Sequence, residues 1–292
     1  MLPFFTVRVL VSIVAFVALA IGAFVYTVFH LEPPPPPPVA VEVEEQWPVH
    51  TAIGASVEGR AIDAYTFGSG STHLVFVGGI HGGYEWNSVV LAYAFVDYLN
   101  THSDIVPKNL KLTIIPSANP DGVYKIVSKE GRFTVADVPA SFDESAGRFN
   151  ARGVDLNRNF DCKWQPESTW RQKVVSAGTK PFSEPEALAL RDFLVRGNPA
   201  AVVFWHSQAN GVYASQCENG ILPKTLDMMN MYAQAAGYPA YKTFDAYATT
   251  GAAEDWLASI GIPAITVELS THETIEWEKN LAGVKAVLDY FE

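Results

Sequence analysis

Residues 73–100 read HLVFVGGIHGGYEWNSVVLAYAFVDYLN and contain a strand, a glycine-rich loop and a helix in one stretch. The apolar run at 73–79 is typical of a buried strand, and the apolar spacing over 86–100 predicts a helix. Between the two, His81 and Glu85 stand four positions apart among glycines. Such a density of glycine indicates a backbone that bends sharply or is closely approached. The loop therefore places two side chains that can bind a metal after the end of a strand.

The rest of the chain after about residue 47 continues this alternation. An antiparallel pair is predicted over 55–70, and a helix over 183–197 with Ser183 as its N-cap. Further strands are predicted at 110–117, 200–207 and 263–269, and further helices at 225–237, 251–261 and 277–291. Strands that alternate with helices predict a single α/β domain, with a mixed, largely parallel central sheet covered by helices on both faces.

Composition limits the classes of partner. The 292 residues are 49% hydrophobic and 17% charged, which is enough apolar chain for one large core. The formal net charge of −11 argues against a nucleic-acid partner.

The N-terminal region has a different character from the rest. Residues 1–31 are expected to form a membrane anchor, because Val9–Phe29 carries no charge and is long enough to span a bilayer. Arg8 before this run predicts a cytoplasmic N-terminus. The alternative is a cleaved signal peptide, with ALA at 18–20 as the cleavage pattern. A stalk at 32–46 with six consecutive prolines then leads to a domain at 47–292, which is anchored outside the cytoplasm, or secreted if the helix is cleaved.

Three predicted strands end in residues suited to metal or acid–base chemistry. His81 follows one strand, His206 lies at the end of another, and Glu268 at the end of a third. Open sheets of this class bind ligands outside the carboxyl ends of their strands. Catalytic zinc takes three ligands of the His and Asp/Glu types and keeps one position open, so we expect one Zn²⁺ per chain on His81, Glu85 and His206. Glu268 then remains as the general base for water.

The order of several motifs resembles the zinc carboxypeptidase family, that is, the carboxypeptidase A-like metallopeptidases of the exported bacterial type. These motifs are HGGYE at 81–85, NPDG at 119–122, GVDLNRNF at 153–160, FWHS at 204–207, YATTGAAEDW at 247–256 and TVEL at 266–269. The resemblance covers essentially everything after the stalk. One departure is that three residues separate His81 from Glu85, where the family usually has two; a glycine-rich loop can absorb the extra residue.

The resemblance also implies roles for individual residues. Asp155 would orient His81, Asn157 and Arg158 would hold the terminal carboxylate of the substrate, and Tyr247 would close over the peptide. Glu268 would activate the zinc-bound water. Arg148 would stabilise the oxyanion, with Arg152 as the rival for that role.

The expected activity is hydrolysis of a C-terminal peptide bond. The substrate would carry a free C-terminal carboxylate, and peptide stems of the cell wall (peptidoglycan) are one class of target that the resemblance implies. Glu254, near the expected side-chain pocket, would favour a basic residue such as diaminopimelate or lysine, unless it is an ordinary solvated helix acid.

Two other functions remain open at this point. One is a zinc deacylase acting on a small amide; the other is a non-catalytic domain that binds cell-wall peptides. The two cysteines, Cys162 and Cys217, are expected to flank the site from neighbouring loops. They would form a disulfide, which an exported location permits, or remain as buried thiols.

Overall fold

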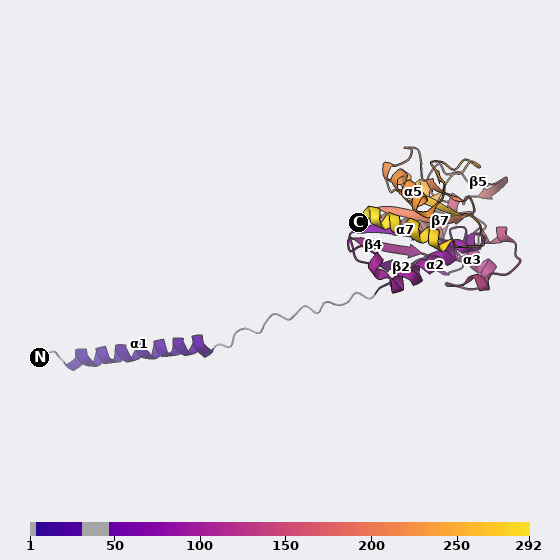
Figure 1. The fold of residues 1–292 in the computed structure, drawn as a ribbon. Helices are drawn as coiled ribbons and strands as arrows, with labels where there is room; N and C mark the ends of the chain where they lie inside the picture. Colours follow the sequence, from indigo (N-terminus) through magenta and orange to yellow (C-terminus); the bar gives the residue numbers. More distant parts are fainter. Residues whose placement is uncertain (1–3, 31–46) are drawn as a thin grey trace. The chain divides into compact units, whose positions relative to one another are not determined.

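The computed structural model describes residues 4–30 and 47–292, which belong to two separate units (Figure 1). The first unit contains helix α1 (Phe4–His30). Its segment Val9–Val28 is long and apolar enough to cross a membrane, a test that a signal sequence would also meet. The predicted stalk at 32–46 lies outside the described residues.

Eight strands of the second unit form one mixed sheet in the order β1-β2-β4-β3-β7-β10-β8-β9. The four central strands, β4, β3, β7 and β10, run parallel to their neighbours within that group. The pairs β1–β2, β2–β4 and β10–β8 are antiparallel. The strands of this sheet are β1 (Val49–Ala55), β2 (Ala61–Phe67), β3 (Thr72–Val77), β4 (Leu110–Ile115), β7 (Ala201–Ser207), β8 (Gly211–Ala214), β9 (Ala240–Tyr241) and β10 (Ala264–Leu269).

Helices connect these strands and lie against both faces of the sheet. The α-helices are α2 (Trp86–Thr101), α3 (Pro120–Val127), α4 (Pro185–Gly197), α5 (Pro223–Ala236), α6 (Ala253–Ser259) and α7 (Trp277–Phe291). Single 3-10 turns are η1 (Gly82–Glu85), η2 (Ser103–Ile105), η3 (Val135–Asp137), η4 (Glu144–Gly147) and η5 (Leu156–Arg158). A separate hairpin, β5 (Glu167–Trp170) with β6 (Lys173–Ser176), lies at the edge of the domain (Figure 1).

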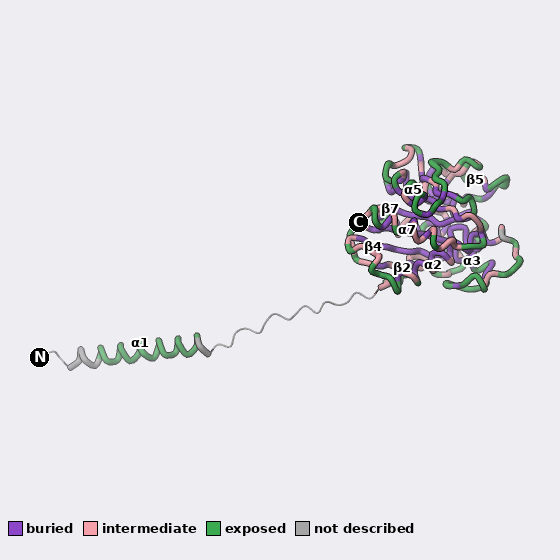
Figure 2. The backbone as a smooth tube through the Cα atoms, in the orientation of Figure 1, coloured by how far each residue is buried: buried purple, intermediate pink, exposed green. Residues whose placement is uncertain are grey.

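The period of two along the strands divides the core between the two faces. On β3, Leu74 and Phe76 pack in a cluster with α2, α5 and α7, whereas Val75 and Val77 pack in a second cluster with α4 and α6. Because both faces are covered, strands such as β7 are buried along their whole length (Figure 2). The predicted fold class is therefore confirmed.

The same geometry positions the residues at the strand ends. His81 comes four residues after β3, and His206 is the last residue but one of β7. In the parallel ladder between β7 and β10, His206 and Glu268 are direct neighbours. Neighbours in a ladder point to the same face, so Glu268 lies beside the histidine.

Several boundaries and elements differ from the sequence-based expectations. The antiparallel pair begins earlier, because β1 and β2 span 49–67. Ser183 is not the N-cap of α4: Glu184 occupies that position and Pro185 opens the helix, while the Ser183 hydroxyl bonds to the Glu184 carboxylate. Helix α3, strands β8 and β9, and the β5–β6 hairpin were not expected from the sequence.

Candidate active site

The loop that carries His81 and Glu85 is packed tightly against its neighbours. A side chain at Gly82 would come within 2.6 Å of the Gly147 carbonyl oxygen, and its φ of +50° also favours glycine. A side chain at Gly83 would meet Ile126 at 2.5 Å. The two glycines therefore let α3 and η4 close over the loop, which fixes the directions of the two flanking side chains.

Three buried side chains converge beyond this loop. The Nδ1 atom of His81 lies 2.7 Å from Oε1 of Glu85, and Nδ1 of His206 lies 3.0 Å from Oε2 of the same carboxylate. The two Nδ1 atoms are only 3.2 Å apart. All three potential ligand atoms lie within 4.8 Å of one another, so a single metal ion can contact each of them.

Electrostatics in this group also fit a cation. Burial alone would raise the pKa of Glu85, but the neighbouring His81 and His206 hold it well below its usual range. Burial lowers the pKa of His206, yet the Glu85 carboxylate outweighs burial and raises it to about 9. The carboxylate thus favours positive charge at the point where the donor atoms meet. Two imidazoles and one carboxylate are the donor set of catalytic zinc.

Asp155 lies behind His81, on the side away from this meeting point. Its Oδ1 is 3.5 Å from Nε2 of His81, at the outer limit of a hydrogen bond. Its Oδ2 accepts from Nε of Arg148 at 2.9 Å and pairs with the same guanidinium at 2.8 Å. Although burial opposes ionisation, the positive charges of Arg148 and Arg158 hold the pKa of Asp155 well below its usual range.

Of the two rival arginines, the structure brings only Arg148 to this site. Arg148 is 2% exposed, and its guanidinium approaches Glu85 to 3.9 Å. The side chain of Arg152 is 55% exposed and pairs with Glu184 at 3.5 Å, outside the group.

Glu268 occupies the other side of the histidines. Its Oε2 accepts a hydrogen bond from the backbone of Ala209 at 3.0 Å. Burial raises the pKa of Glu268 to about 7, and the charge of Glu85 acts in the same direction. A carboxyl with a pKa near neutrality can both take up and release a proton at physiological pH.

Asn157 and Arg158 lie in η5, where backbone contacts hold them. The Asn157 amide bridges Ala253 and Glu254 at 2.8 and 3.4 Å. The Arg158 guanidinium is buried and donates to the carbonyl oxygens of Asn157 and Thr169. Among residues 4–30 and 47–292, no carboxylate lies within 4.0 Å of this guanidinium. Its buried charge is therefore available to an anionic ligand.

Two hollows meet over the three convergent side chains, and we call them the deep hollow and the hairpin hollow. The deep hollow is lined in part by Arg158, Glu254 and Asp255. Burial and the charge of Glu254 raise the pKa of Asp255 to about 7. Tyr247 lines both hollows and packs against Phe244 at 4.9 Å between ring centres.

The hairpin hollow extends to the opposite side. Tyr84, Trp170 and Arg171 line it together with His81 and Glu268. The ring centres of Tyr84 and Trp170 are 5.2 Å apart. Tyr84 is one of the three residues between the two predicted ligands, and it joins their loop to the β5–β6 hairpin.

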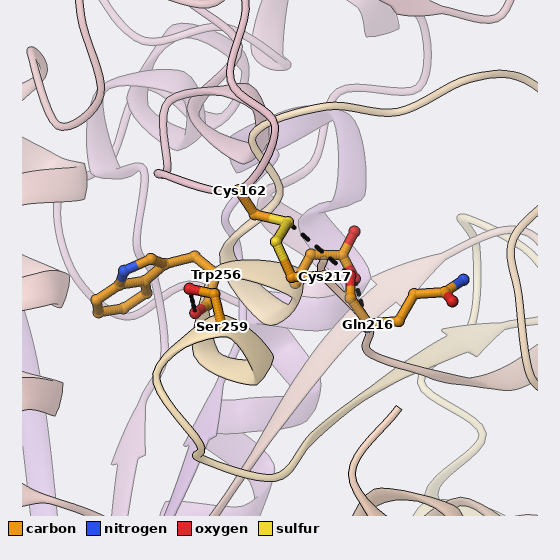
Figure 3. Close-up of a disulfide and its surroundings, with 6 residues drawn as sticks. Cys162, Gln216, Cys217, Trp256 and Ser259 are labelled. Atoms are coloured by element: carbon orange, nitrogen blue, oxygen red, sulfur yellow. Dashed lines mark hydrogen bonds between the residues drawn. A yellow bond between two sulfur atoms is a disulfide. The ribbon is translucent and has the colours of Figure 1, made fainter. Parts of the chain in front are cut away.

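Cys162 and Cys217 form a disulfide, with 6.0 Å between their Cα atoms (Figure 3). Cys162 follows η5, and Cys217 follows Gln216, which lines the deep hollow. Helix α6 lies next to the bond, with Trp256 and Ser259 nearby in Figure 3. The cysteines thus flank the site as expected, and of the two alternatives the structure has the disulfide.

Several residues that line the hollows were not predicted from the sequence. Thr266 could have been found, because it stands two positions before Glu268 on the same face of β10. Asp255 was adjacent to a predicted site residue. Trp170 and Arg171 gave no comparable signal, because their hairpin turn contains neither glycine nor asparagine.

Comparison with known proteins gives the family. The model of the zinc carboxypeptidase family matches residues 48–282. Gamma-D-glutamyl-L-diamino acid endopeptidase 1 of Lysinibacillus sphaericus is 26% identical over 243 residues, covering 76% of this chain and 60% of that protein. Murein peptide amidase A of Escherichia coli K12 is 33% identical over 131 residues, covering 41% of this chain and 50% of that protein. The matched part of the chain therefore spans only half to three fifths of the length of these relatives.

Solved structures agree on the fold. The murein-tripeptide amidase of Escherichia coli O157 aligns with a TM-score of 0.58 and 25% identity, covering 84% of this chain and 93% of that one. Thrombin activatable fibrinolysis inhibitor aligns with a TM-score of 0.68 and 20% identity, covering 84% of this chain and 72% of the other.

Proposed function

The chain belongs to the zinc carboxypeptidase family, and from that premise we propose that it releases the C-terminal residue of a peptide by zinc-dependent hydrolysis. The observation that carries the proposal is Arg158, a buried guanidinium without an acidic partner among the described residues, in a hollow next to the metal-binding group. Arginine binds a carboxylate through two parallel hydrogen bonds. A terminal carboxylate held there would place the last peptide bond over the metal group.

We assign zinc to His81, Glu85 and His206. If they are its ligands, His206→Ala should lose most of the zinc found by metal analysis of the purified protein. His102→Ala, which alters an exposed histidine of the surface, should keep one zinc per chain. Equal zinc content in the two variants would contradict the assignment of His206 as a zinc ligand.

The surrounding residues have separate tasks in this mechanism. Zinc bound to this donor set supplies a Lewis acid that polarises a carbonyl and makes water more acidic. Glu268 takes the proton from the attacking water and passes it to the leaving amine. Arg148 is held by Asp155, and its guanidinium lies next to the proposed zinc ligand Glu85. There its remaining N–H groups would stabilise the negative charge on the former carbonyl oxygen. Asp155 also fixes the tautomer of His81, and Tyr247 packs over the bound peptide.

The substrate that fits the deep hollow has a basic side chain on its C-terminal residue. Glu254 and Asp255 lie there beside Arg158, so the hollow offers negative charge for an amine and positive charge for a carboxylate. A diamino acid such as lysine or diaminopimelate carries both groups. The names of the relatives from Lysinibacillus and Escherichia coli, which refer to a diamino acid and to murein, favour cell-wall stem peptides as the source.

Incubation of the zinc-loaded protein with defined muropeptides and ordinary peptides tests this proposal. Mass spectrometry should detect release of a free C-terminal diamino acid. Products that lack only a small acyl group would favour the deacylase function. Tight binding without any product would favour a non-catalytic domain.

We also propose that α1 anchors the chain in a membrane with the catalytic domain outside the cytoplasm. The apolar segment Val9–Val28 and the disulfide support this, because disulfides persist in oxidising compartments. Added protease should degrade the domain on cells whose outer barrier has been removed. Complete protection until the inner membrane is lysed would contradict this topology.

A further inference from the structure

The β5–β6 hairpin places the positively charged guanidinium of Arg171 at the hairpin hollow. Arg171, the first residue of its turn, donates a hydrogen bond from Nη2 to the Tyr84 hydroxyl at 3.0 Å. The centre of its guanidinium lies 5.6 Å from the Trp170 ring. Since Tyr84 stands between His81 and Glu85, these contacts tie the arginine to the loop that carries two of the proposed zinc ligands.

The charge of Arg171 is not neutralised by the part of the chain that the structure describes. By contrast, Arg132 and Arg191 each pair with an aspartate at 2.6 Å. Arg171 has no carboxylate within 4.0 Å in residues 47–292, and its hydrogen bond goes to a neutral hydroxyl. A guanidinium has five N–H donors, so most of them remain for a ligand in the hollow.

The backbone at this position favours a different residue. Arg171 has a φ of 55°, in the left-handed region, and it is the first of the two residues between the paired strand ends Trp170 and Lys173. Two-residue hairpin turns prefer glycine, asparagine or aspartate where φ is positive. An arginine in this conformation is less favourable than a glycine. The geometry of the turn therefore does not account for an arginine at this position.

The position of the hairpin hollow defines which part of a substrate it would meet. The deep hollow, with Arg158 and Glu254, would take the C-terminal residue. The hairpin hollow shares His81, Arg148 and Glu268 with it and extends away to Tyr84 and Trp170. A peptide whose last residue fills the deep hollow therefore places the preceding residue, on the acyl side of the cleaved bond, in the hairpin hollow.

We propose that Arg171 binds a carboxylate carried by the residue on the acyl side of the scissile bond, with Tyr84 and Trp170 holding the guanidinium in place. This inference rests on the proposed peptidase function. The carboxylate has two possible sources. It is the α-carboxylate when a glutamyl residue is linked through its γ-carboxyl, and it is the side chain when an acidic residue has an ordinary α-linkage.

Four tripeptides with a C-terminal lysine separate these sources. The γ-linked pair is L-Ala-γ-D-Glu-L-Lys and the same peptide in which the α-carboxylate of the D-Glu residue is a carboxamide. The C-terminal carboxylate of lysine is free in both. The α-linked pair is L-Ala-L-Glu-L-Lys and L-Ala-L-Gln-L-Lys. Release of lysine by the full-length, zinc-loaded protein in detergent gives kcat/KM for each. Each pair differs only in the charge that Arg171 would read.

For at least one pair, we expect the wild-type protein to favour the carboxylate by about tenfold, the effect of one partly solvated, charge-assisted contact. In Arg171→Met, which keeps a long side chain beside Trp170, this ratio should fall toward one. Lys173→Met is the matched control, because its ammonium lies 5.6 Å from the same ring. This control should keep the wild-type ratio. That result would show that the effect of Arg171→Met is not caused by a general loss of positive charge from the hairpin.

The possible outcomes distinguish a failure of the proposed peptidase function from a failure of the proposed role of Arg171. If neither these tripeptides nor the muropeptides and ordinary peptides with a free C-terminus are cleaved, the peptidase function fails. If other peptides are cleaved but none of these tripeptides is, the function stands and the role of Arg171 is wrong. If both members of each pair are cleaved equally well by the wild-type protein, the function stands and the role of Arg171 is wrong. An equal loss of the ratio in Arg171→Met and Lys173→Met would also overturn it, in favour of long-range electrostatic attraction.

Discussion

At the scale of single residues, the environment of Glu268 determines its chemistry. It shares one face of the sheet with His206, is held by the Ala209 N–H, and has a pKa of about 7 because of its burial. A solvated glutamate would be ionised and a weak base at neutral pH. In the metal-free protein, burial and the charge of Glu85 keep this carboxyl near the midpoint of its titration, where proton uptake and release are both accessible.

Glu268→Gln tests this role directly. Glutamine keeps the size of the side chain but cannot accept the proton, so kcat should fall by about two to four orders of magnitude. Zinc content should stay at the wild-type level, because Glu268 is not among the three convergent ligand atoms. Near-normal turnover in this variant would show that another group is the base.

The same variant gives a stability prediction for the metal-free protein. The folded-state pKa of about 7 lies above the ordinary value of 4.5, so the folded protein holds a proton that the unfolded chain releases. Stability is therefore lost as the pH rises from 4.5 to 7. Glutamine removes this loss, and Glu268→Gln should gain about 2 to 4 kcal/mol over wild type above pH 7, but almost nothing below pH 4.5. Denaturant unfolding of chelator-treated protein measures both; a gain independent of pH would contradict the prediction.

At this scale, much of the candidate site could be predicted from the sequence. His81, His206 and Glu268 could be placed together because the carboxyl ends of parallel strands meet at one edge of a sheet. The choice between Arg148 and Arg152 could not be made, since both precede η5 in irregular backbone without a period to orient them. Only the packing shows that Arg148 turns inward to Asp155 while Arg152 turns out to Glu184.

At the scale of elements, the disulfide holds together the loops around the deep hollow. The Cys162 carbonyl also accepts from the Gly251 N–H, and Phe160 N–H donates to the Gly251 carbonyl. The segment after Arg158 is thus fastened on one side to the chain that leads into α6 and on the other side to Cys217.

Loss of this bond should lower stability by about 3 to 4 kcal/mol, because the two cysteines are 55 residues apart and close a long loop. The double variant Cys162→Ser/Cys217→Ser, compared with wild type by denaturant unfolding, measures the effect. Intact-mass analysis of the wild type should show two alkylated thiols only after reduction. Two alkylated thiols without reductant would rule the bond out.

The elements themselves were predictable to different degrees. Long periodic helices such as α7 and apolar strands such as β7 were evident, because burial imposes the pattern. The β5–β6 hairpin was not, since its turn residues Arg171 and Gln172 are unusual for a tight turn. The turn residues of this hairpin depart from the usual preference of tight turns for glycine and asparagine, and the hairpin borders the site.

At the scale of the whole molecule, one sheet edge brings together groups from distant parts of the chain. The three proposed zinc ligands stand at positions 81, 85 and 206 and the proposed base at 268, and Arg158 is the residue proposed to bind the terminal carboxylate. In the proposed function Arg158 distinguishes a carboxypeptidase from an endopeptidase, because a buried positive charge in the deep hollow would select a chain end.

The central claim is therefore tested by comparing a peptide that has a free C-terminus with the same peptide amidated, in wild type, Arg158→Ala and Arg152→Ala. Losing a buried ion pair costs about 3 to 5 kcal/mol. Arg158→Ala should accordingly lower kcat/KM for the free peptide by about two to four orders of magnitude and change the poor cleavage of the amidated peptide little. Arg152→Ala, whose exposed side chain faces Glu184, should behave as wild type. Equal cleavage of the free and amidated peptides by the wild-type protein would contradict the account.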